Sequence, residues 1–378
     1  MPTPFPPPPY CYAGLGNPAI LKIAHIDTGK DFRGGQELLV SLARGLKQRG
    51  HRQVIIPRSS SPLAGRASAE AFDVCPLGGM IALRRFLRDQ QVDIVHAHDG
   101  RAQTISYRAS LGLPVVRVAT RQVAFTPRHP LVHRWKYSLT SNGVIANSQA
   151  VRRVLLDAGV PDAHIEVIEP GIELPPARPS AATRAEARAR WNLSPDHFVL
   201  GHIGAFTREK GQDIAVQAAA LLAPKLPHAR ILLAGDGPEK AALERAAPDN
   251  VQFPGFLDDP DSIYSALDLF IMPSRSESWG LTALRAMSFG IPVIASAVGG
   301  LAELVEPGIS GWLVPPESPE ALAAAILEAA SDADRLRQLG CNARTRAEQF
   351  PIARTVERTE QFYLRLLSAA GAGRPQPI

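Results

Sequence analysis

The chain has 378 residues, more than one hydrophobic core usually supports, so two domains are expected. Its 45% hydrophobic and 20% charged residues are typical of a globular protein, and no run of about 18 apolar residues predicts a membrane-spanning helix. The net charge is +5, but no recognisable nucleic-acid-binding module accompanies it, so nucleic acid is not an expected partner.

The ends of the chain and its cysteines bear on where the protein works. The opening MPTPFPPPPY has neither the basic nor the apolar region of a secretion signal, and we expect Pro-rich disordered tails at 1–19 and 371–378. Cys11, Cys75 and Cys341 lie far apart and outside any CxxC pattern, which favours a reducing compartment. The expected location is the cytoplasm, and peripheral contact with the inner face of the membrane is left open.

Short apolar runs alternate with helical patterns over residues 20–173. Strands are expected at 21–27, 52–57, 92–99, 113–120 and 143–148, and helices at 34–51, 80–90, 101–111 and from Gln149. This alternation predicts a parallel sheet with helices on both faces, which is an N-terminal Rossmann-like domain.

Prolines and a short Ala/Arg-rich helix interrupt the alternation at 174–195, which is predicted to be an interdomain linker. The alternation resumes over 196–350, with strands expected within 197–206, 229–237, 251–256, 267–274 and 291–296, and helices at 211–223, 238–246, 261–266, 281–289 and 318–330. A last helix within 351–370 can pack back on the first domain. The predicted fold is therefore α/β, with two Rossmann-like domains facing a central cleft, where ligands bind at the carboxyl ends of the strands.

Glycines follow two of these strands. Gly34 and Gly35 open a helix whose free N–H groups and positive end suit a diphosphate or carboxylate, and an ordinary tight turn is the alternative. Gly235 and Asp236 follow the run ARILLA, and FPGF, ending at Phe256, is expected to be a strand-end loop whose backbone can hold a planar base.

The segment PSRSESWGLTALRAMSFGIPVIAS gives the strongest local signal. Glu277 stands in the loop after an apolar strand, and Gly280, Leu281 and Thr282 then open a helix whose amides can face a phosphate. A carboxylate at such a junction can accept hydrogen bonds from sugar hydroxyls, and capping of the helix is the alternative.

Two groups resemble metal sites. Asp258, Asp259 and Asp261 form an acidic cluster, but Asp261 is expected to cap the following helix. His96 and His98 share one face of a strand, yet no third ligand is apparent, so they are expected to line the cleft or to have a structural role. We therefore expect no metal and no cofactor.

The motifs GGQE, VHAHD, EKG, AGDGPE, FPGF and SESWGLTALRAMSFGIPVIAS, followed by VGGLAEL, occur in this order over roughly residues 20–368. In this combination the chain resembles the family 4 glycosyltransferases, which have the GT-B fold. The resemblance implies metal-independent transfer, with retention of configuration, of a sugar from a UDP- or GDP-sugar. It also implies that the donor binds mainly to the second domain and the acceptor mainly to the first.

The resemblance also assigns roles. Lys210 corresponds to the lysine that neutralises the diphosphate, and Glu277 to the first glutamate of an E-x₇-E motif that holds the donor sugar. The amides of Gly280, Leu281 and Thr282 would contact the phosphates, with Gly34 and Gly35 closing over them. The candidate catalytic residues are Glu277, Lys210, Arg121 and His98. The candidate donor-binding residues are Gly34, Gly35, Arg208, Gly235, Asp236, Phe256, Gly280, Leu281, Thr282 and Arg285.

This chain departs from the family pattern in three places. Arg285 occupies the position of the second glutamate, and Ala205 occupies that of a common arginine, for which Arg208 is a nearby substitute. Arg121 lies at or near the position of a histidine close to the reacting carbon. An epimerase of the same fold and a binding protein without turnover are the alternative functions.

The basic residues concentrate in the first half, where residues 1–175 carry 21 Lys and Arg against 13 Asp and Glu. They include Arg84, Arg85 and Arg88, and a second segment in which Trp135 and Tyr137 lie among Arg128, Arg134 and Lys136. This mixture favours a lipid-linked or anionic glycan acceptor at the membrane surface, as in cell-envelope polysaccharide or lipopolysaccharide synthesis. An ordinary solvated basic face is the alternative.

Overall fold

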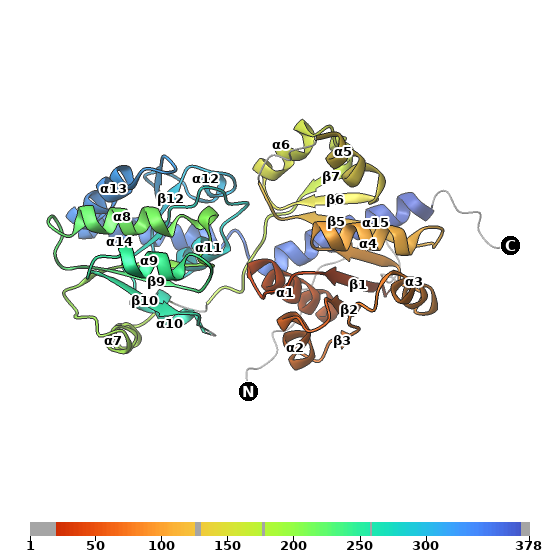
Figure 1. Ribbon diagram of the computed structural model, residues 1–378, viewed down its shortest axis with the longest axis horizontal. Helices are drawn as coiled ribbons and strands as arrows, with labels where there is room; N and C mark the ends of the chain where they lie inside the picture. The colour runs from red at the N-terminus through yellow and green to blue at the C-terminus, as the bar shows by residue number, and fades with distance from the viewer. Residues whose placement is uncertain (1–19, 125–129, 176–177, 258, 372–378) are drawn as a thin grey trace.

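The computed structural model describes residues 20–124, 130–175, 178–257 and 259–371. The tail predicted at 1–19, almost all of the one at 371–378, and Arg128 and Asp258 lie outside these ranges. The described chain forms two α/β domains, each with its own parallel sheet (Figure 1). The predicted fold class is confirmed.

The first sheet has seven strands in the order β3-β2-β1-β4-β5-β6-β7. The strands are β1 (Lys22–Asp27), β2 (Arg52–Pro57), β3 (Asp73–Val74), β4 (Ile94–Ala97), β5 (Val116–Arg121), β6 (Gly143–Ala146) and β7 (Ile165–Val167). The helices between them are α1 (Gly34–Gln48), α2 (Pro62–Ala69), α3 (Met80–Asp89), α4 (Gly100–Ser110), α5 (Pro130–Leu139) and α6 (Gln149–Asp157). The strand order reverses direction at β1 and β4, and ligands bind beyond the carboxyl ends of strands at such a point.

The second sheet has six strands in the order β10-β9-β8-β11-β12-β13. They are β8 (Phe198–Ile203), β9 (Ala229–Ala234), β10 (Val251–Gly255), β11 (Leu269–Met272), β12 (Val293–Ser296) and β13 (Gly311–Val314). The helices are α8 (Gln212–Leu222), α9 (Lys240–Ala246), α10 (Asp261–Ala266), α11 (Leu281–Ser288), α12 (Leu301–Leu304), α13 (Pro319–Ser331) and α14 (Ala333–Ala347). The strand expected within 251–256 is β10, and it includes residues 253–255, so the predicted strand-end loop is wrong for these three residues.

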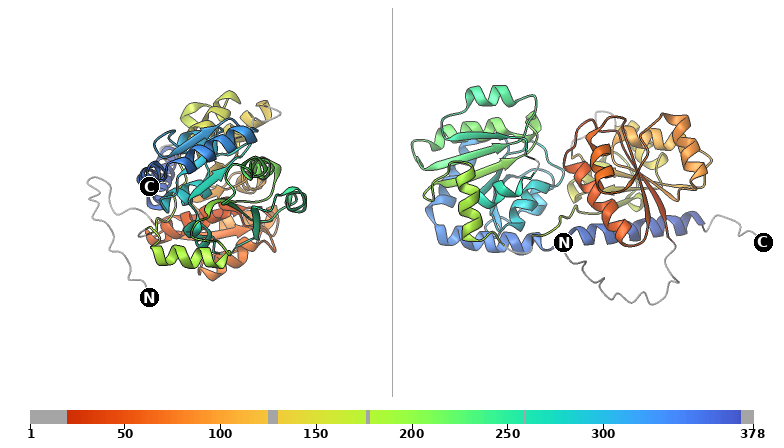
Figure 2. Two further views of the ribbon diagram at one scale, coloured as in Figure 1. Left: turned by 90° about the vertical axis from the view of Figure 1, so that its left-hand side faces the viewer. Right: turned by 90° about the horizontal axis from the view of Figure 1, so that it is seen from below.

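The last described helix, α15 (Ile352–Gly371), returns to the first domain, and the right-hand view of Figure 2 shows it along the lower edge of that domain. Val356, Phe362 and Tyr363 join the buried cluster that contains Ile23 and Leu46. The same helix is held by polar contacts, including those of Glu360 with Arg49 and His51. The core of the first domain is therefore completed by the end of the chain.

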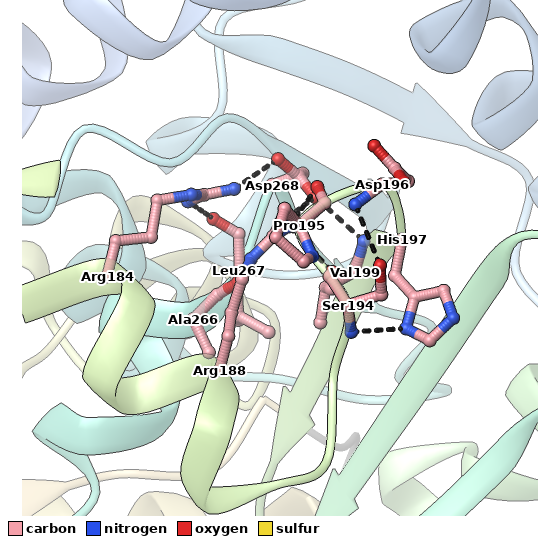
Figure 3. A network of polar contacts seen from close by, with 10 residues as sticks. All are labelled: Arg184, Arg188, Ser194, Pro195, Asp196, His197, Val199, Ala266, Leu267 and Asp268. Carbon is pink, nitrogen blue, oxygen red and sulfur yellow. Dashed lines mark hydrogen bonds and ion pairs between the residues drawn. The ribbon is translucent and has the colours of Figure 1, made fainter. Parts of the chain in front are cut away.

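The short helix predicted within the linker is α7 (Ala181–Arg190), and it is bound to the second domain (Figure 3). Arg184 and Arg188 both form ion pairs with Asp268, which precedes β11, and Asp268 also accepts a hydrogen bond from Val199 N at 2.8 Å. Since three donors converge on one carboxylate, α7 is part of the second domain and not a free connection.

Replacing Asp268 with Asn should lower the free energy of unfolding of the second domain by about 2 kcal/mol, because charge-assisted hydrogen bonds are lost and two arginines keep their charge. Water partly screens this ion pair and keeps the loss small, because the side chains of Asp268 and Arg184 are 21% and 35% exposed. Urea unfolding measures the change, and Asp334→Asn, which affects an exposed ion pair with Arg337, is the control. Equal midpoints for the two variants would contradict the structural role of Asp268.

Candidate active site

Lys210 and Glu277 meet at the carboxyl edge of the second sheet. Lys210 ends a short 3₁₀ turn after β8, Glu277 lies between β11 and α11, and Lys210 Nζ lies 2.5 Å from Glu277 Oε2. The side chains are 26% and 11% exposed, so the ion pair is partly shielded from water. The structure thus brings together the candidates for diphosphate and sugar binding.

The N-terminus of α11 follows this pair. Gly280 has φ +102°, a backbone conformation that favours glycine. Its carbonyl accepts a hydrogen bond from Leu284 N, the first such bond of the helix. The amides of Leu281 and Thr282 precede this bond and therefore have no acceptor within the helix. A methyl group added to Gly34 of α1 would lie 3.3 Å from the Leu281 side chain. The positive ends of two helices, one from each domain, therefore approach each other beside Glu277.

Two further contacts position the first domain here. A Cβ on Gly35 would overlap the Gln122 amide, at 2.3 Å from Oε1, so the glycine allows Gln122 to lie on the start of α1. Arg121 is buried, and its guanidinium bonds to Val123 O and lies near His133 and Tyr137. These contacts pack Arg121 against residues of its own domain.

A second group of candidates lies where β8, β9 and β10 end. Gly235 N donates to Gly255 O at 2.8 Å, and a Cβ on Gly235 would lie 1.9 Å from Gly204 O. Asp236 accepts from Gly237 N, and Phe256 is 66% exposed. These residues form a close-packed backbone surface with an exposed aromatic ring at its edge.

Arg208 is exposed and faces a different opening. It lines a cleft of about 260 Å³ together with Thr207, Glu239 and Arg275. Arg275 fixes this region by a bidentate ion pair with Asp213 and a hydrogen bond to Arg208 O. Arg208 therefore lies two residues before Lys210 in the chain but lines a neighbouring cleft.

Arg285 lies one turn after Leu281 and pairs with Asp261 through Nε at 3.1 Å and Nη2 at 2.6 Å. Its Nη1 donates to Glu173 O, in the segment that leaves the first domain. The predicted capping role of Asp261 is wrong, because this carboxylate binds Arg285 while Asp259 accepts the Asp261 amide. Burial raises the pKa of Glu37 on α1, and the nearby Arg285 opposes that shift.

The histidine prediction needs a correction, because a third histidine is present. The register of β1 and β4 pairs His25 with His96, and the ligand atoms of His25, His96 and His98 lie within 4.8 Å of one another. Their nitrogens are hydrogen bonded: His25 to His98 at 3.0 Å and to Gln53, and His96 to Tyr363 and Thr120. Burial lowers the pKa of His25 to about 4 and also lowers those of the other two. This arrangement is that of neutral imidazoles in a structural network.

A small cavity of about 20 Å³ lies above these histidines, which is room for about one water molecule. His96, His98, Gln122 and Asn147 line it, and the His98 side chain is buried. Asn147 connects the cavity wall to the second domain, because its Nδ2 donates to Ser278 Oγ at 2.9 Å. Our sequence interpretation missed Asn147, although a polar residue directly after the apolar run GVIA was the available signal.

Comparisons with known proteins agree with this architecture. Residues 183–346 match the family model described as glycosyl transferases group 1, and residues 32–174 match that of glycosyltransferase family 4. A D-inositol 3-phosphate glycosyltransferase of Catenulispora acidiphila is 31% identical over 313 residues, covering 75% of this chain and 74% of the relative. The enzyme of the same name from Salinispora tropica is 29% identical, over 79% of this chain and 69% of its own length.

Solved structures have the same fold. The crystal structure of Anabaena HepE in complex with UDP and glucose has a TM-score of 0.82 at 23% identity, covering 91% of this chain and 99% of that one. Sucrose-phosphate synthase from Thermosynechococcus elongatus has a TM-score of 0.76 at 25% identity, covering 92% and 100%. Fold and site therefore define a glycosyltransferase of the GT-B class. The chain belongs to glycosyltransferase family 4, and it is an enzyme that transfers sugars.

Proposed function

We propose that the enzyme transfers a sugar from a UDP- or GDP-sugar to a glycan or lipid-linked acceptor with retention of configuration. The Lys210–Glu277 pair, located where the N-termini of α1 and α11 approach each other, carries this proposal. An ammonium group and two sets of free amides suit a diphosphate, and a carboxylate suits the hydroxyls of the attached sugar. Binding of the diphosphate would draw Lys210 away from Glu277 and free that carboxylate for the sugar.

The chemistry follows from the charge that develops. As the bond between the sugar and the phosphate breaks, negative charge grows on the leaving diphosphate, and Lys210 with the helix amides would stabilise it. The leaving phosphate can take the proton of the acceptor hydroxyl as the new glycosidic bond forms on the same face. Contact between the domains would exclude water and so limit hydrolysis of the donor.

A screen of UDP- and GDP-sugars by thermal shift, followed by turnover of those that bind, tests the proposal. A donor that binds the native state raises the apparent stability, and the anomeric configuration of the product, read by NMR, tests retention. Conversion of the donor without an acceptor into another nucleotide sugar would favour the epimerase alternative. Absence of binding by every nucleotide sugar would contradict the proposal.

The same site makes activity independent of divalent metal ions, because Lys210 and backbone amides would balance the diphosphate charge. We expect transfer rates to be the same after treatment with EDTA and after addition of Mn²⁺ or Mg²⁺. Loss of activity in EDTA that either ion restores would contradict this expectation. We propose neither a metal ion nor any other cofactor.

For the acceptor, we propose an anionic, lipid-linked glycan precursor of the cell envelope, such as one for lipopolysaccharide, reached from the cytoplasm. Helix α3 supports this choice, because Met80 and Ile81 are 49% and 75% exposed beside Arg85 and Arg88. The second basic segment offers less aromatic surface for membrane contact than the sequence predicts, because Trp135 is 51% exposed but Tyr137 is buried. None of the helices in the described part of the chain is long and apolar enough to span a bilayer.

Binding of α3 to membranes should be peripheral and sensitive to salt, since each basic residue near an anionic surface contributes about 1 kcal/mol. Sedimentation with anionic liposomes at low salt measures it, and Ile81→Glu is expected to reduce the bound fraction several-fold. Ile309→Glu, at a position 53% exposed on the second domain, is the matched control. No preference for anionic over neutral liposomes would contradict the membrane proposal and leave the transferase proposal intact.

A small phosphorylated polyol is a second candidate acceptor. The relative from Catenulispora acidiphila, named a D-inositol 3-phosphate glycosyltransferase, favours it, because the match extends over 75% of this chain. Both candidates share an anionic group, which suits the basic first half. Turnover of inositol 3-phosphate in free solution, without lipid, would select this second candidate.

A further inference from the structure

The two domains also meet where the start of α6 lies against α12. Glu303 of α12 accepts hydrogen bonds from Gln149 N at 2.9 Å and from Ala150 N at 2.6 Å. These amides belong to the first turn of α6, where backbone N–H groups have no partner within the helix. The second domain therefore supplies acceptors that a helix of the first domain lacks.

Charge favours this contact. The N-terminus of a helix carries a partial positive charge, so a carboxylate that accepts its amides stabilises it. Within α6 itself, the Ser148 hydroxyl caps the helix by accepting from Val151 N at 3.1 Å. If the domains separated, the amides of Gln149 and Ala150 would be exposed to water. Protection of these amides from hydrogen exchange therefore measures the contact between the domains directly.

Helix α12 is firmly attached to the loop that holds Glu277. Gly300 N, just before α12, donates to Glu277 O at 3.1 Å. A Cβ on Gly300 would lie 2.2 Å from Ser278 O, and one on Gly280 would lie 2.5 Å from the Leu301 side chain. α12 and the Glu277 loop therefore pack directly against each other and form one packed unit.

The first domain contacts this unit at two points that are close together in its own sequence. Asn147 donates to Ser278, the residue after Glu277, while Gln149 and Ala150 donate to Glu303. The buried Asn147 side chain and the start of α6 therefore fix how the Glu277 loop faces the first domain.

We propose that Glu303 is a positioning residue that couples closure of the domains to the placement of Glu277. When the domains meet, the Glu303 carboxylate accepts hydrogen bonds from the first turn of α6. Because Gly300, just before α12, bonds to Glu277 O, this contact also determines the position of the Glu277 loop. The catalytic consequence rests on the proposed function, whereas the contact itself can be tested without a substrate.

Hydrogen exchange of the ligand-free, full-length protein tests the contact. Glu303→Gln keeps the side-chain shape but removes the charge, and we expect exchange at the first turn of α6 to become about tenfold faster. Glu306→Gln is the matched control, because Glu306 lies three residues away and pairs with Arg346 of its own domain. Exchange in Glu303→Gln that equals that of the wild-type protein would overturn the proposal.

Kinetics with UDP-glucose as the probe, or with whichever nucleotide sugar the donor screen identifies, tests the consequence. We expect Glu303→Gln to lower kcat/KM about tenfold by changing kcat and KM together, as loss of a closure contact does, with Glu306→Gln unchanged. Faster exchange with unaltered kinetics would overturn the coupling to Glu277. If the wild-type chain turns over no nucleotide sugar, the proposed function fails, and exchange alone supports or overturns the contact.

Discussion

Replacing Glu277 with Gln is expected to lower the rate of sugar transfer about 10²-fold, which is the usual loss when one preorganised contact to a transition state is removed. The amide keeps the size of the side chain but loses the charge that pairs with Lys210 and would hold the donor hydroxyls. Steady-state kinetics with the donor found by the screen measures the change in kcat.

Glu317→Gln is the matched control, because Glu317 is exposed and pairs with Arg275 outside the site. Glu317→Gln should unfold at the wild-type temperature, whereas Glu277→Gln should unfold at a slightly lower one, because its ion pair is partly shielded from water. An unchanged kcat in Glu277→Gln would remove this residue from the active site.

The stability of the fold should decrease markedly between pH 7 and pH 5. Burial lowers the pKa values of His25 and His202 to about 4, from an ordinary value of 6.5, so both remain neutral in the folded protein at pH 5. The unfolded chain binds protons at these positions below about pH 6.5, which favours unfolding. Each histidine would then reduce the free energy of unfolding by about 2 kcal/mol at pH 5.

Urea unfolding at pH 7 and pH 5 measures this loss. Asp27 and Glu37 act in the opposite direction, because burial raises their pKa values, so a variant is needed to isolate the histidines. His202→Asn should reduce the loss of unfolding free energy between pH 7 and pH 5 by the contribution of one histidine, about 2 kcal/mol. Equal stability of the wild-type protein at the two pH values would contradict the neutral state of the buried imidazoles.

The sequence predicted most of the fold, because long strands and amphipathic helices carry a strong periodic signal. The strands that we missed are short: β3 has two residues, and β7 and β13 have three and four. All three are edge strands. β3 and β7 are too short to show a period, whereas β13 is as long as β12, which the sequence did predict. Helix α14 was missed although Leu339, Ala343 and Ala347 recur at helical spacing on its buried side.

The sequence named the candidate site residues, but it could not predict the contacts between them. Lys210 and Glu277 are 67 positions apart, and only the fold brings them within 2.5 Å. The third histidine, His25, was overlooked because its neighbour His96 lies on β4, and the register between β1 and β4 is not encoded locally. For the same reason no local pattern indicated that Glu303 would accept the amides of α6.

Because α15 follows both sheets in the sequence, the first domain cannot complete its core until α15 has been synthesised. A nascent chain that stops near residue 350 already contains every strand of both sheets. It still lacks Phe362 and Tyr363, which cover Ile23 and neighbouring apolar side chains of the first sheet. The second domain can complete its core earlier, so the first domain keeps an exposed hydrophobic surface until the twenty residues of α15 have been synthesised.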